Sequence, residues 1–355
     1  MYKPLLHPEF RFNNKAFASK NELIAHALFL AENGTNDELA IGSFILEWLN
    51  ETSYIVVKTS GSTGAPKKVK LQKKNVFNSA EATVNFFDVK EGTKALLCLS
   101  AEYIAGKMML VRAMIAGWHL FTAAPGKNPL ENTKTIFDFS AMVPYQVYHS
   151  LQDLHKLKKL IIGGGAVSNS LNEQLQNKPT KVFATYGMTE TISHIAARPI
   201  NGPDKTSVFR ALPNVKFSTN RNDCLQINAP AISEEVVKTN DVVELLSTTS
   251  FKFLGRIDNV INSGGVKVHP EIIEEKLSAN IDTAFFIASE KDEALGERVI
   301  MVLETSKAVT LKDFSTTFTA LSKYEIPKKV YTTAHFIYTD TGKIKRAEVL
   351  KKLFI

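Results

Sequence analysis

Strand-like and helix-like segments alternate between residues 136 and 187, and this alternation constrains the fold more than any other feature of the chain. Amphipathic helical patterns at 144–154 and 168–176 separate four apolar β-type runs, at 137–139, 141–143, 159–162 and 181–184. Such an alternation predicts a parallel sheet with helical crossovers. Ligands of such sheets collect at the carboxyl ends of the strands, where Gly163-Gly164-Gly165 and Thr185-Tyr186-Gly187 stand.

A second feature is a polar loop that follows the apolar run 54–57. It contains Thr59, Ser60, Gly61, Ser62, Thr63, Gly64 and Lys67. Glycines allow a close backbone approach, and hydroxyls and a lysine donate to phosphoryl oxygens, so the loop is suited to hold phosphate. It is not a Walker loop, because no Gly-Lys-Ser/Thr follows at the required spacing. Taken alone, it is equally compatible with a polar turn between two strands.

Length and composition favour an ordinary globular protein of two domains. A chain of 355 residues exceeds the size at which one core usually keeps growing, and 44% of the residues are hydrophobic. No apolar run approaches the ~20 residues that cross a bilayer, and the N-terminus lacks a signal-peptide core, so we expect a cytoplasmic protein without a membrane span. Cys98 and Cys224 lie in apolar strand-like contexts and are expected to be buried thiols.

The net charge of +7 is unevenly distributed along the chain. Residues 258–355 carry 14 basic and 14 acidic side chains, so the whole excess lies in residues 1–257. No long Lys/Arg run interleaved with aromatic residues occurs, which argues against nucleic acid as the partner. Small anionic ligands account for the basic surface better.

Five motifs, in their order along the chain, resemble the adenylate-forming superfamily of acyl-CoA synthetases. The polar loop at 59–67 resembles the phosphate loop of that family. The other four are Tyr186-Gly187-Met188-Thr189-Glu190, Gly255-Arg256-Ile257-Asp258, Ser263-Gly264-Gly265 and Thr341-Gly342-Lys343. The resemblance extends from about Trp48 to the C-terminus, and the segment before the phosphate loop is shorter than is usual in the family.

This resemblance implies a fold and a domain division. It implies an N-terminal AMP-binding α/β domain with a parallel sheet and a small β subdomain, residues 1–257, and a small mobile α+β lid, residues 258–355. Asp258 would be the hinge between them. In the lid we expect helices at 270–277 and 311–323 and strands at 266–268, 283–288, 299–304 and 329–337.

The resemblance also implies which residues bind the nucleotide. Residues 59–64 and Lys67 would hold the β- and γ-phosphates, Gly163, Gly164 and Gly165 would flank the adenine, and Tyr186 would stack on it. Gly187 and Met188 belong to the same motif. Asp241, in Thr239-Asn240-Asp241, would bind the ribose hydroxyls, and Arg256 would also reach the nucleotide.

Three residues are implied to act in catalysis. Thr189 would bind the α-phosphate, Glu190 would ligate Mg²⁺ and Lys343 would be carried in by the lid. From their own sequence context, Thr189 and Glu190 are also typical of a helix N-cap with a first-turn acid, and Asp241 of a turn. Lys343, with Lys345 and Arg346, is also typical of a solvated charge cluster.

The acyl site is expected along segment 102–112. Tyr103 and Gly106 match the start of the family's pocket helix, although the family's His is absent. Lys107 and Arg112 are either ordinary helix-surface cations or contacts for a substrate carboxylate, because an unpaired charge on an apolar helix is costly to bury. His194 is expected to pack or to line the pocket rather than act as a base, since the attacking carboxylate is already ionised.

An arginine in this helix also resembles the o-succinylbenzoate-CoA ligase branch of the family. That branch implies ATP-dependent activation of an aromatic dicarboxylate and its transfer to coenzyme A, a step of menaquinone biosynthesis. Ser263, Gly264 and Gly265 would line the path of coenzyme A. The alternatives are another aryl- or fatty-acyl-CoA ligase and a nucleotide-binding protein without catalysis.

Overall fold

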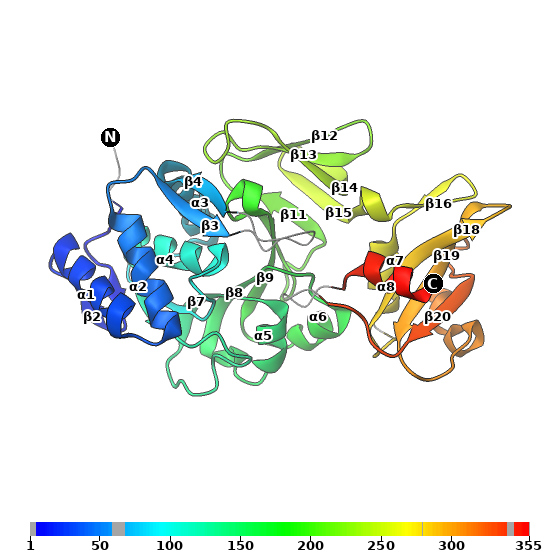
Figure 1. Ribbon diagram of the computed structural model, residues 1–355, viewed down its shortest axis with the longest axis horizontal. Coiled ribbons are helices and arrows are strands. Elements are labelled where there is room, and N and C mark those ends of the chain that lie inside the picture. The colour runs from blue at the N-terminus through cyan, green and yellow to red at the C-terminus, as the bar shows by residue number, and fades with distance from the viewer. Residues whose placement is uncertain (1–4, 59–67, 279, 339–343, 355) are drawn as a thin grey trace.

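The computed structural model describes residues 5–58, 68–278, 280–338 and 344–354. The α-helices in these ranges are α1 (Lys20–Asn33), α2 (Asn36–Leu49), α3 (Lys73–Phe87), α4 (Ile104–Ala116), α5 (Pro144–His149), α6 (Asn169–Leu175), α7 (Pro270–Leu277) and α8 (Arg346–Leu353). None of them is long and apolar enough to cross a membrane. In Figure 1, α1 and α2 lie at one end of the molecule, and α8 lies at the other with the strands that follow residue 260.

Thirteen strands within the described ranges form one sheet, in the order β12-β13-β14-β15-β11-β10-β9-β8-β7-β5-β6-β1-β2. They are β1 (Arg11–Phe12), β2 (Lys15–Ala16), β5 (Lys94–Leu97), β6 (His119–Thr122), β7 (Phe137–Met142), β8 (Leu157–Ile162), β9 (Lys181–Gly187), β10 (His194–Pro199), β11 (Val208–Ala211), β12 (Lys216–Thr219), β13 (Cys224–Asn228), β14 (Val237–Ser247) and β15 (Ser250–Arg256). The strands from β9 to β1 are parallel, which confirms the fold class predicted from the alternation. From β10 to β12 the pairing is antiparallel.

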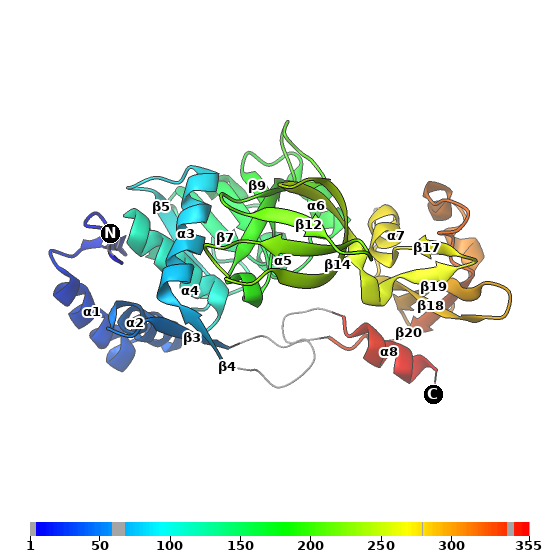
Figure 2. The same cartoon turned by 90° about the horizontal axis from the view of Figure 1, so that it is seen from above.

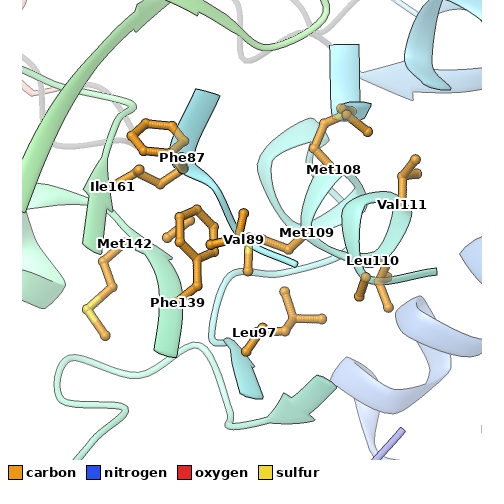
Figure 3. Packing of buried hydrophobic residues seen from close by; sticks show 14 of the residues in the cluster. Phe87, Val89, Leu97, Met108, Met109, Leu110, Val111, Phe139, Met142 and Ile161 are labelled. Carbon is orange, nitrogen blue, oxygen red and sulfur yellow. The ribbon is translucent and has the colours of Figure 1, made fainter. Parts of the chain in front are cut away.

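Helix α4 packs against the centre of the parallel sheet. Figure 3 shows Met109 and Leu110 of α4 beside Leu97 of β5 and Phe139 of β7. The helix is apolar nearly all round, so burial rather than one amphipathic face determines its place. Gly106 allows the close approach, because a Cβ there would lie 2.2 Å from the carbonyl oxygen of Ser100.

A short hairpin stands apart from the large sheet. Strands β3 (Tyr54–Lys58) and β4 (Lys68–Gln72) form a two-stranded antiparallel sheet between α2 and α3 (Figure 2). Ile55 and Val57 bury their side chains in the core. Residues 59–67, which connect the two strands, lie outside the described ranges.

The strands after residue 260 form a second sheet, in the order β17-β16-β19-β18 with β20 paired to β19. They are β16 (Ile261–Ser263), β17 (Val266–Val268), β18 (Phe285–Asp292), β19 (Gly296–Glu304) and β20 (Lys329–Thr333). The apolar clusters of this part share no residue with the core that ends at Phe251. We therefore propose residues 1–257 and 258–355 as the two domains and refer to the second as the lid.

Two expectations for the lid were wrong in detail. The helix predicted at 311–323 is replaced by two 3₁₀ turns, Leu311–Phe314 and Thr317–Ala320. The segment between them is Ser-Thr, followed by a further Thr, and these short hydroxyl side chains compete with helical hydrogen bonds or lose rotamer freedom in a helix. The strand predicted at 329–337 ends at Thr333.

Candidate functional site

Three residues predicted to bind the nucleotide meet at the end of β9. The Tyr186 hydroxyl donates a hydrogen bond to Oδ2 of Asp241 in β14. Asp241 faces Arg256 across the β14–β15 pair, with Nη1 and Oδ1 3.9 Å apart. Burial and the Asp241 carboxylate raise the pKa of Tyr186 above its usual range, so its hydroxyl stays protonated as a donor. The site therefore offers an aromatic face beside a carboxylate and a guanidinium.

The two glycine-containing runs lie side by side at the carboxyl ends of β8 and β9, because these strands are parallel neighbours. Gly163 follows β8 directly, and a Cβ there would lie 2.9 Å from Oγ1 of Thr185. Gly164 has φ +78°, which favours glycine. Position 187 also requires glycine, because the backbone of Ser193 approaches it closely. A Cβ at this position would lie 2.4 Å from the Ser193 carbonyl oxygen.

The residues after β9 form a tight 3₁₀ turn, Thr189–Thr191, that brings the chain back into β10. The turn ends at Ile192, a buried β-branched residue with φ +66°, which costs of order 1–3 kcal/mol and marks a backbone held by its surroundings. Thr189 is half-buried and Glu190 is exposed. This arrangement presents Glu190 to solvent rather than placing it in a buried ion pair.

Glu190 is suited to a magnesium site in which water and the phosphates of a nucleotide supply most of the ligands. Across the part of the chain that the structure describes, no group of three or more His, Cys, Asp or Glu side chains could hold a metal ion. Mg²⁺ keeps several waters and usually binds through one or two carboxylates and the phosphates of a nucleotide. A single exposed carboxylate at the end of β9 is compatible with that kind of site.

Arg112 is a buried cation without an acidic partner in the described ranges. It is 2% exposed, and its Nη2 donates to Oγ of Ser193 at 3.2 Å. Ser193 in turn shares a 2.9 Å hydrogen bond with Oγ of Ser79 on α3. Arg112 Nε has no hydrogen-bond partner there, and burial lowers the pKa of Arg112 to about 9. A guanidinium held in this way keeps unused hydrogen-bonding capacity that suits an anion.

His194 lies in the same polar cluster. Its Nε2 is 3.2 Å from Oγ1 of Thr83, one turn after Ser79 on α3. Burial and the charge of Arg112 lower the pKa of His194 well below its usual value, so the ring is neutral. Ser79 and Thr83 were not predicted as site residues from the sequence. Their signal in the sequence is two hydroxyls four residues apart on the otherwise apolar face of α3.

Lys107, the other cation of α4, already has protein partners. Its ammonium donates to Oε2 of Glu47 at 3.2 Å and to the Val56 carbonyl at 2.8 Å. It also lies 4.9 Å from the centre of the Phe44 ring. These contacts leave Arg112 as the stronger candidate for an acid carboxylate. Tyr103, at the N-cap of α4, is 52% exposed and thus accessible to a ligand.

The predicted hinge sits in a short 3₁₀ turn, Ile257–Asn259, directly after β15. Oδ2 of Asp258 accepts hydrogen bonds from Arg256 Nη2 at 3.2 Å and Asn240 Nδ2 at 3.3 Å. Asp258 is therefore tied to two residues next to the nucleotide site.

The lid also contacts the large domain beyond this turn. A Cβ at Gly255 would lie 2.3 Å from Oε2 of Glu271 in α7, and the Asn169 side chain donates to the Glu275 carbonyl. Contacts of this kind hold α7 of the lid against β15 and α6.

Ser263, Gly264 and Gly265 form the end of the β16–β17 hairpin. Both glycines have positive φ, +58° and +81°, as a two-residue type I′ turn requires. The Gly264 N–H donates to the Leu295 carbonyl at 2.9 Å, which ties the turn to the neighbouring segment.

A cavity of about 640 Å³ lies between this hairpin and strands β12, β14 and β15. Asn262, Lys267 and His269 line it from the lid side, and Val242 to Leu245 line it from β14. None of the residues predicted to bind the nucleotide lines it. The cavity is therefore separate from the Tyr186 site and adjoins the hairpin predicted to meet coenzyme A.

Two of the predicted motifs lie outside the described ranges. They comprise Thr59, Ser60, Gly61, Ser62, Thr63, Gly64 and Lys67 of the phosphate loop, and Lys343 of the C-terminal motif. The described residues on either side of the first motif are the two strands of the β3–β4 hairpin. The second is followed by α8, a helix that was not predicted from the sequence.

Comparison with known proteins identifies relatives along most of the chain. Residues 47–218 match the family model described as AMP-binding enzyme. A 2-succinylbenzoate–CoA ligase of Escherichia coli K12 is 25% identical over 293 residues, which cover 78% of this chain and 64% of the relative. The chain thus spans less than two thirds of the length of that relative.

Solved structures show the same fold. An o-succinylbenzoate CoA synthetase of Bacillus subtilis, crystallised with its acyl-adenylate intermediate, is 20% identical, with a TM-score of 0.71 over 83% of this chain and 68% of that one. An acyl-CoA synthetase (AMP-forming)/AMP-acid ligase II-like protein of Dyadobacter fermentans is 35% identical, with a TM-score of 0.61 over 90% of this chain and 95% of that one. The chain therefore belongs to the AMP-binding enzymes, the adenylate-forming superfamily that its motifs resemble.

Proposed function

We propose that this protein is an AMP-forming acid–thiol ligase that activates o-succinylbenzoate with ATP and transfers the acyl group to coenzyme A. Such a reaction is a step in menaquinone biosynthesis. Two lines support the proposal. The chain is 25% identical to a 2-succinylbenzoate–CoA ligase, and its pocket helix carries a buried arginine that lacks an acidic partner in the described ranges.

The choice of o-succinylbenzoate as the acid rests on the environment of Arg112. Of its two terminal nitrogens, Nη2 contacts a serine hydroxyl and Nη1 lies 3.9 Å from a methionine sulfur, which are weak partners for a full charge. A buried charge without a counter-ion is costly, so a ligand that supplies a carboxylate is favoured here. A fatty acid offers only the carboxylate that reacts. An aromatic dicarboxylate offers a second one, which Arg112 and Ser193 would hold.

In the first step a carboxylate oxygen of the acid bonds to the α-phosphorus of ATP. The bond from that phosphorus to the bridging oxygen breaks, and its electron pair leaves with pyrophosphate. Tyr186, Asp241 and Arg256 would orient the adenosine, Thr189 would donate to the α-phosphate, and Lys343 would stabilise the charge that develops there. Magnesium, held by Glu190, would neutralise phosphate charge when bound.

In the second step the thiol sulfur of coenzyme A attacks the acyl carbon. The bond from that carbon to the AMP oxygen breaks, AMP leaves with the electron pair, and the thiol proton passes to solvent. The two steps need different groups at one site, so the lid would rotate about Asp258 between them. In the second orientation the Ser263-Gly264-Gly265 hairpin would face the arm of coenzyme A.

Pyrophosphate release with a panel of acids tests the proposal. The panel contains o-succinylbenzoate, benzoate, a coumarate and medium-chain fatty acids, each with the wild type, Arg112→Ala and Arg198→Ala. Arg198 is a matched control, because its Nε also lacks a partner in the described ranges while its Nη1 donates to the Thr206 carbonyl. We expect o-succinylbenzoate to be the best substrate and Arg112→Ala alone to lose the preference for dicarboxylates.

Other outcomes would point to other functions. A monocarboxylate as the best substrate indicates another aryl- or fatty-acyl-CoA ligase. Release of ADP and phosphate instead of AMP and pyrophosphate indicates an ATPase. Nucleotide binding without turnover of any acid indicates a nucleotide-binding protein without catalysis.

A further inference from the structure

Glu47 of α2 and Lys107 of α4 hold a single residue of the β3–β4 hairpin by its backbone. Oε1 of Glu47 accepts a hydrogen bond from the Val56 N–H at 2.7 Å, and Nζ of Lys107 donates to the Val56 carbonyl at 2.8 Å. The two side chains also pair with each other at 3.2 Å. We name this arrangement the Glu47–Lys107 clamp.

The clamp occupies the place of a third strand. Val56 pairs with Lys70 of β4, and residues of an antiparallel strand alternately turn both backbone groups toward the partner strand or away from it. The backbone groups of Val56 are turned away, toward α2 and α4. A two-stranded hairpin is marginally stable alone, so its position depends on contacts of this kind.

The clamp is also well shielded from water. The Lys107 side chain is 11% exposed and the Glu47 side chain is 27% exposed, and the Phe44 ring covers the ammonium. Loss of either partner would leave the other charge poorly solvated and unpaired. The base of the hairpin has a further anchor, because Lys73 Nζ donates to the Asn50 carbonyl at 2.7 Å. The described part of the hairpin is thus fixed at its base and at its middle.

We propose that the Glu47–Lys107 clamp is a positioning device for the triphosphate of ATP. Val56 precedes Thr59 by three residues, and the connection from β3 to β4 carries the motif predicted to hold the β- and γ-phosphates. By fixing β3, the clamp determines where and in which direction that connection begins. This inference rests on the proposed function, and it gives Lys107 a role other than contact with the acid.

A comparison of ATP and AMP binding tests the clamp, because AMP lacks the two phosphates that the β3–β4 connection would hold. In Lys107→Met, calorimetry should show the affinity for a magnesium complex of a non-hydrolysable ATP analogue falling at least roughly tenfold. The affinity for AMP should stay within about twofold. The KM for MgATP should rise while the KM for the acid does not, and thioester formation from supplied acyl-adenylate should be spared.

Two further variants of the clamp keep the test decisive. Glu47→Gln keeps an acceptor for the Val56 N–H but removes the ion pair, and it should show a smaller loss with the same selectivity for ATP. Lys107→Arg keeps a charged donor and should restore most of the ATP affinity. If Lys107→Met does not fold, the ratio of ATP to AMP affinity in Glu47→Gln decides in its place.

Lys156→Met is the matched control. In the wild type, the Lys156 ammonium pairs with Asp153 at 2.8 Å and donates to the Leu130 carbonyl at 2.9 Å. The side chains of Lys156 and Asp153 are 16% and 23% exposed. An equal loss of ATP and AMP affinity in Lys107→Met, or the same ATP-selective loss in Lys156→Met, overturns the clamp proposal. A wild type that releases no pyrophosphate with any acid refutes the proposed function itself, whatever the variants show.

Discussion

The hydroxyl of Tyr186 donates to the carboxylate of Asp241 and thereby joins the carboxyl end of β9 to β14. The two residues are 55 positions apart in the sequence, and Arg256 faces Asp241 from β15. An adenosine bound here would meet an aromatic ring, a carboxylate and a guanidinium that already contact one another. Little rearrangement would be needed when the nucleotide binds.

Asp241→Ala should weaken ATP and AMP binding equally, because Asp241 would contact the ribose that both share. We expect a loss of roughly tenfold to a hundredfold, since a hydrogen bond to a charged group contributes about 1.5–3 kcal/mol. Calorimetry with both nucleotides measures it. Glu244→Ala, a change of an exposed carboxylate on the same strand, is the control. A loss confined to ATP would contradict the assignment of Asp241 to the ribose.

Lys343→Ala should slow adenylation by about 10²–10³-fold, because it removes a cation directed at developing charge. Thioester formation from supplied acyl-adenylate should continue at near the wild-type rate. Single-turnover assays of each half-reaction separate the two effects. Lys345→Ala removes a nearby lysine that pairs with Glu348 at 3.1 Å, and it should leave both steps intact. Equal loss of both steps in Lys343→Ala would refute the role.

Gly264→Leu should stop thioester formation while acyl-adenylate accumulates. The turn demands φ +58° at this position, and an added Cβ would lie 3.1 Å from Leu295. Gly265→Asn is the control, because a Cβ at Gly265 meets no atom within 4 Å and Asn tolerates positive φ. Acyl-adenylate trapped by rapid quench is the measurement. Unchanged turnover with coenzyme A in Gly264→Leu would show that the hairpin does not line its path.

The lid should become less stable as the pH rises toward neutrality, because of Glu274. Burial outweighs its 2.8 Å ion pair with Arg346 and raises the pKa of Glu274 from 4.5 to about 7. Between these values the native protein binds a proton that the unfolded chain lacks, so the free energy of unfolding falls with rising pH. The loss is at most about 3 kcal/mol.

Urea denaturation of the wild type and Glu274→Gln between pH 4.5 and 7.5, followed by circular dichroism, measures this effect. The difference in the free energy of unfolding between the wild type and Glu274→Gln should change across that pH range. Glu325→Gln in the same lid is the control. Burial opposes the ionisation of Glu325, but contacts with Lys276 and Ser322 hold the pKa of Glu325 below its usual range. The Glu325 side chain is therefore ionised in the native protein within this pH range. A constant difference for Glu274→Gln would contradict the raised pKa.

The parallel sheet could be predicted from the sequence, but the roles of individual cations could not. Lys107 and Arg112 are five residues apart on one apolar helix. In the sequence, both are cations that would be costly to bury without a partner. What distinguishes them is Glu47, which lies 60 positions before Lys107 and pairs with it in the fold. Local patterns contain no information on such a partner.

The lid shows the same limit. The α7 helix was predicted at its observed bounds, Pro270–Leu277, because a proline begins it and its apolar residues recur at helical spacing. The α8 helix was not predicted, because the charged residues at its start are also typical of a solvated cluster. Arg346, at the first position of α8, instead bonds Glu274 and lies over the Phe286 ring. Those partners are 72 and 60 residues earlier in the chain.

The thirteen-stranded sheet ends in short strands that begin with lysine, β2 with Lys15 on one side and β12 with Lys216 on the other. Unpaired edge strands are templates for aggregation, and short strands with exposed lysines discourage it. A second molecule that approached either edge would have to bury an ammonium group to extend the sheet. Addition of a second molecule to either edge of this sheet is therefore disfavoured, and a change of both lysines to valine should promote fibrillar aggregates detectable by thioflavin fluorescence.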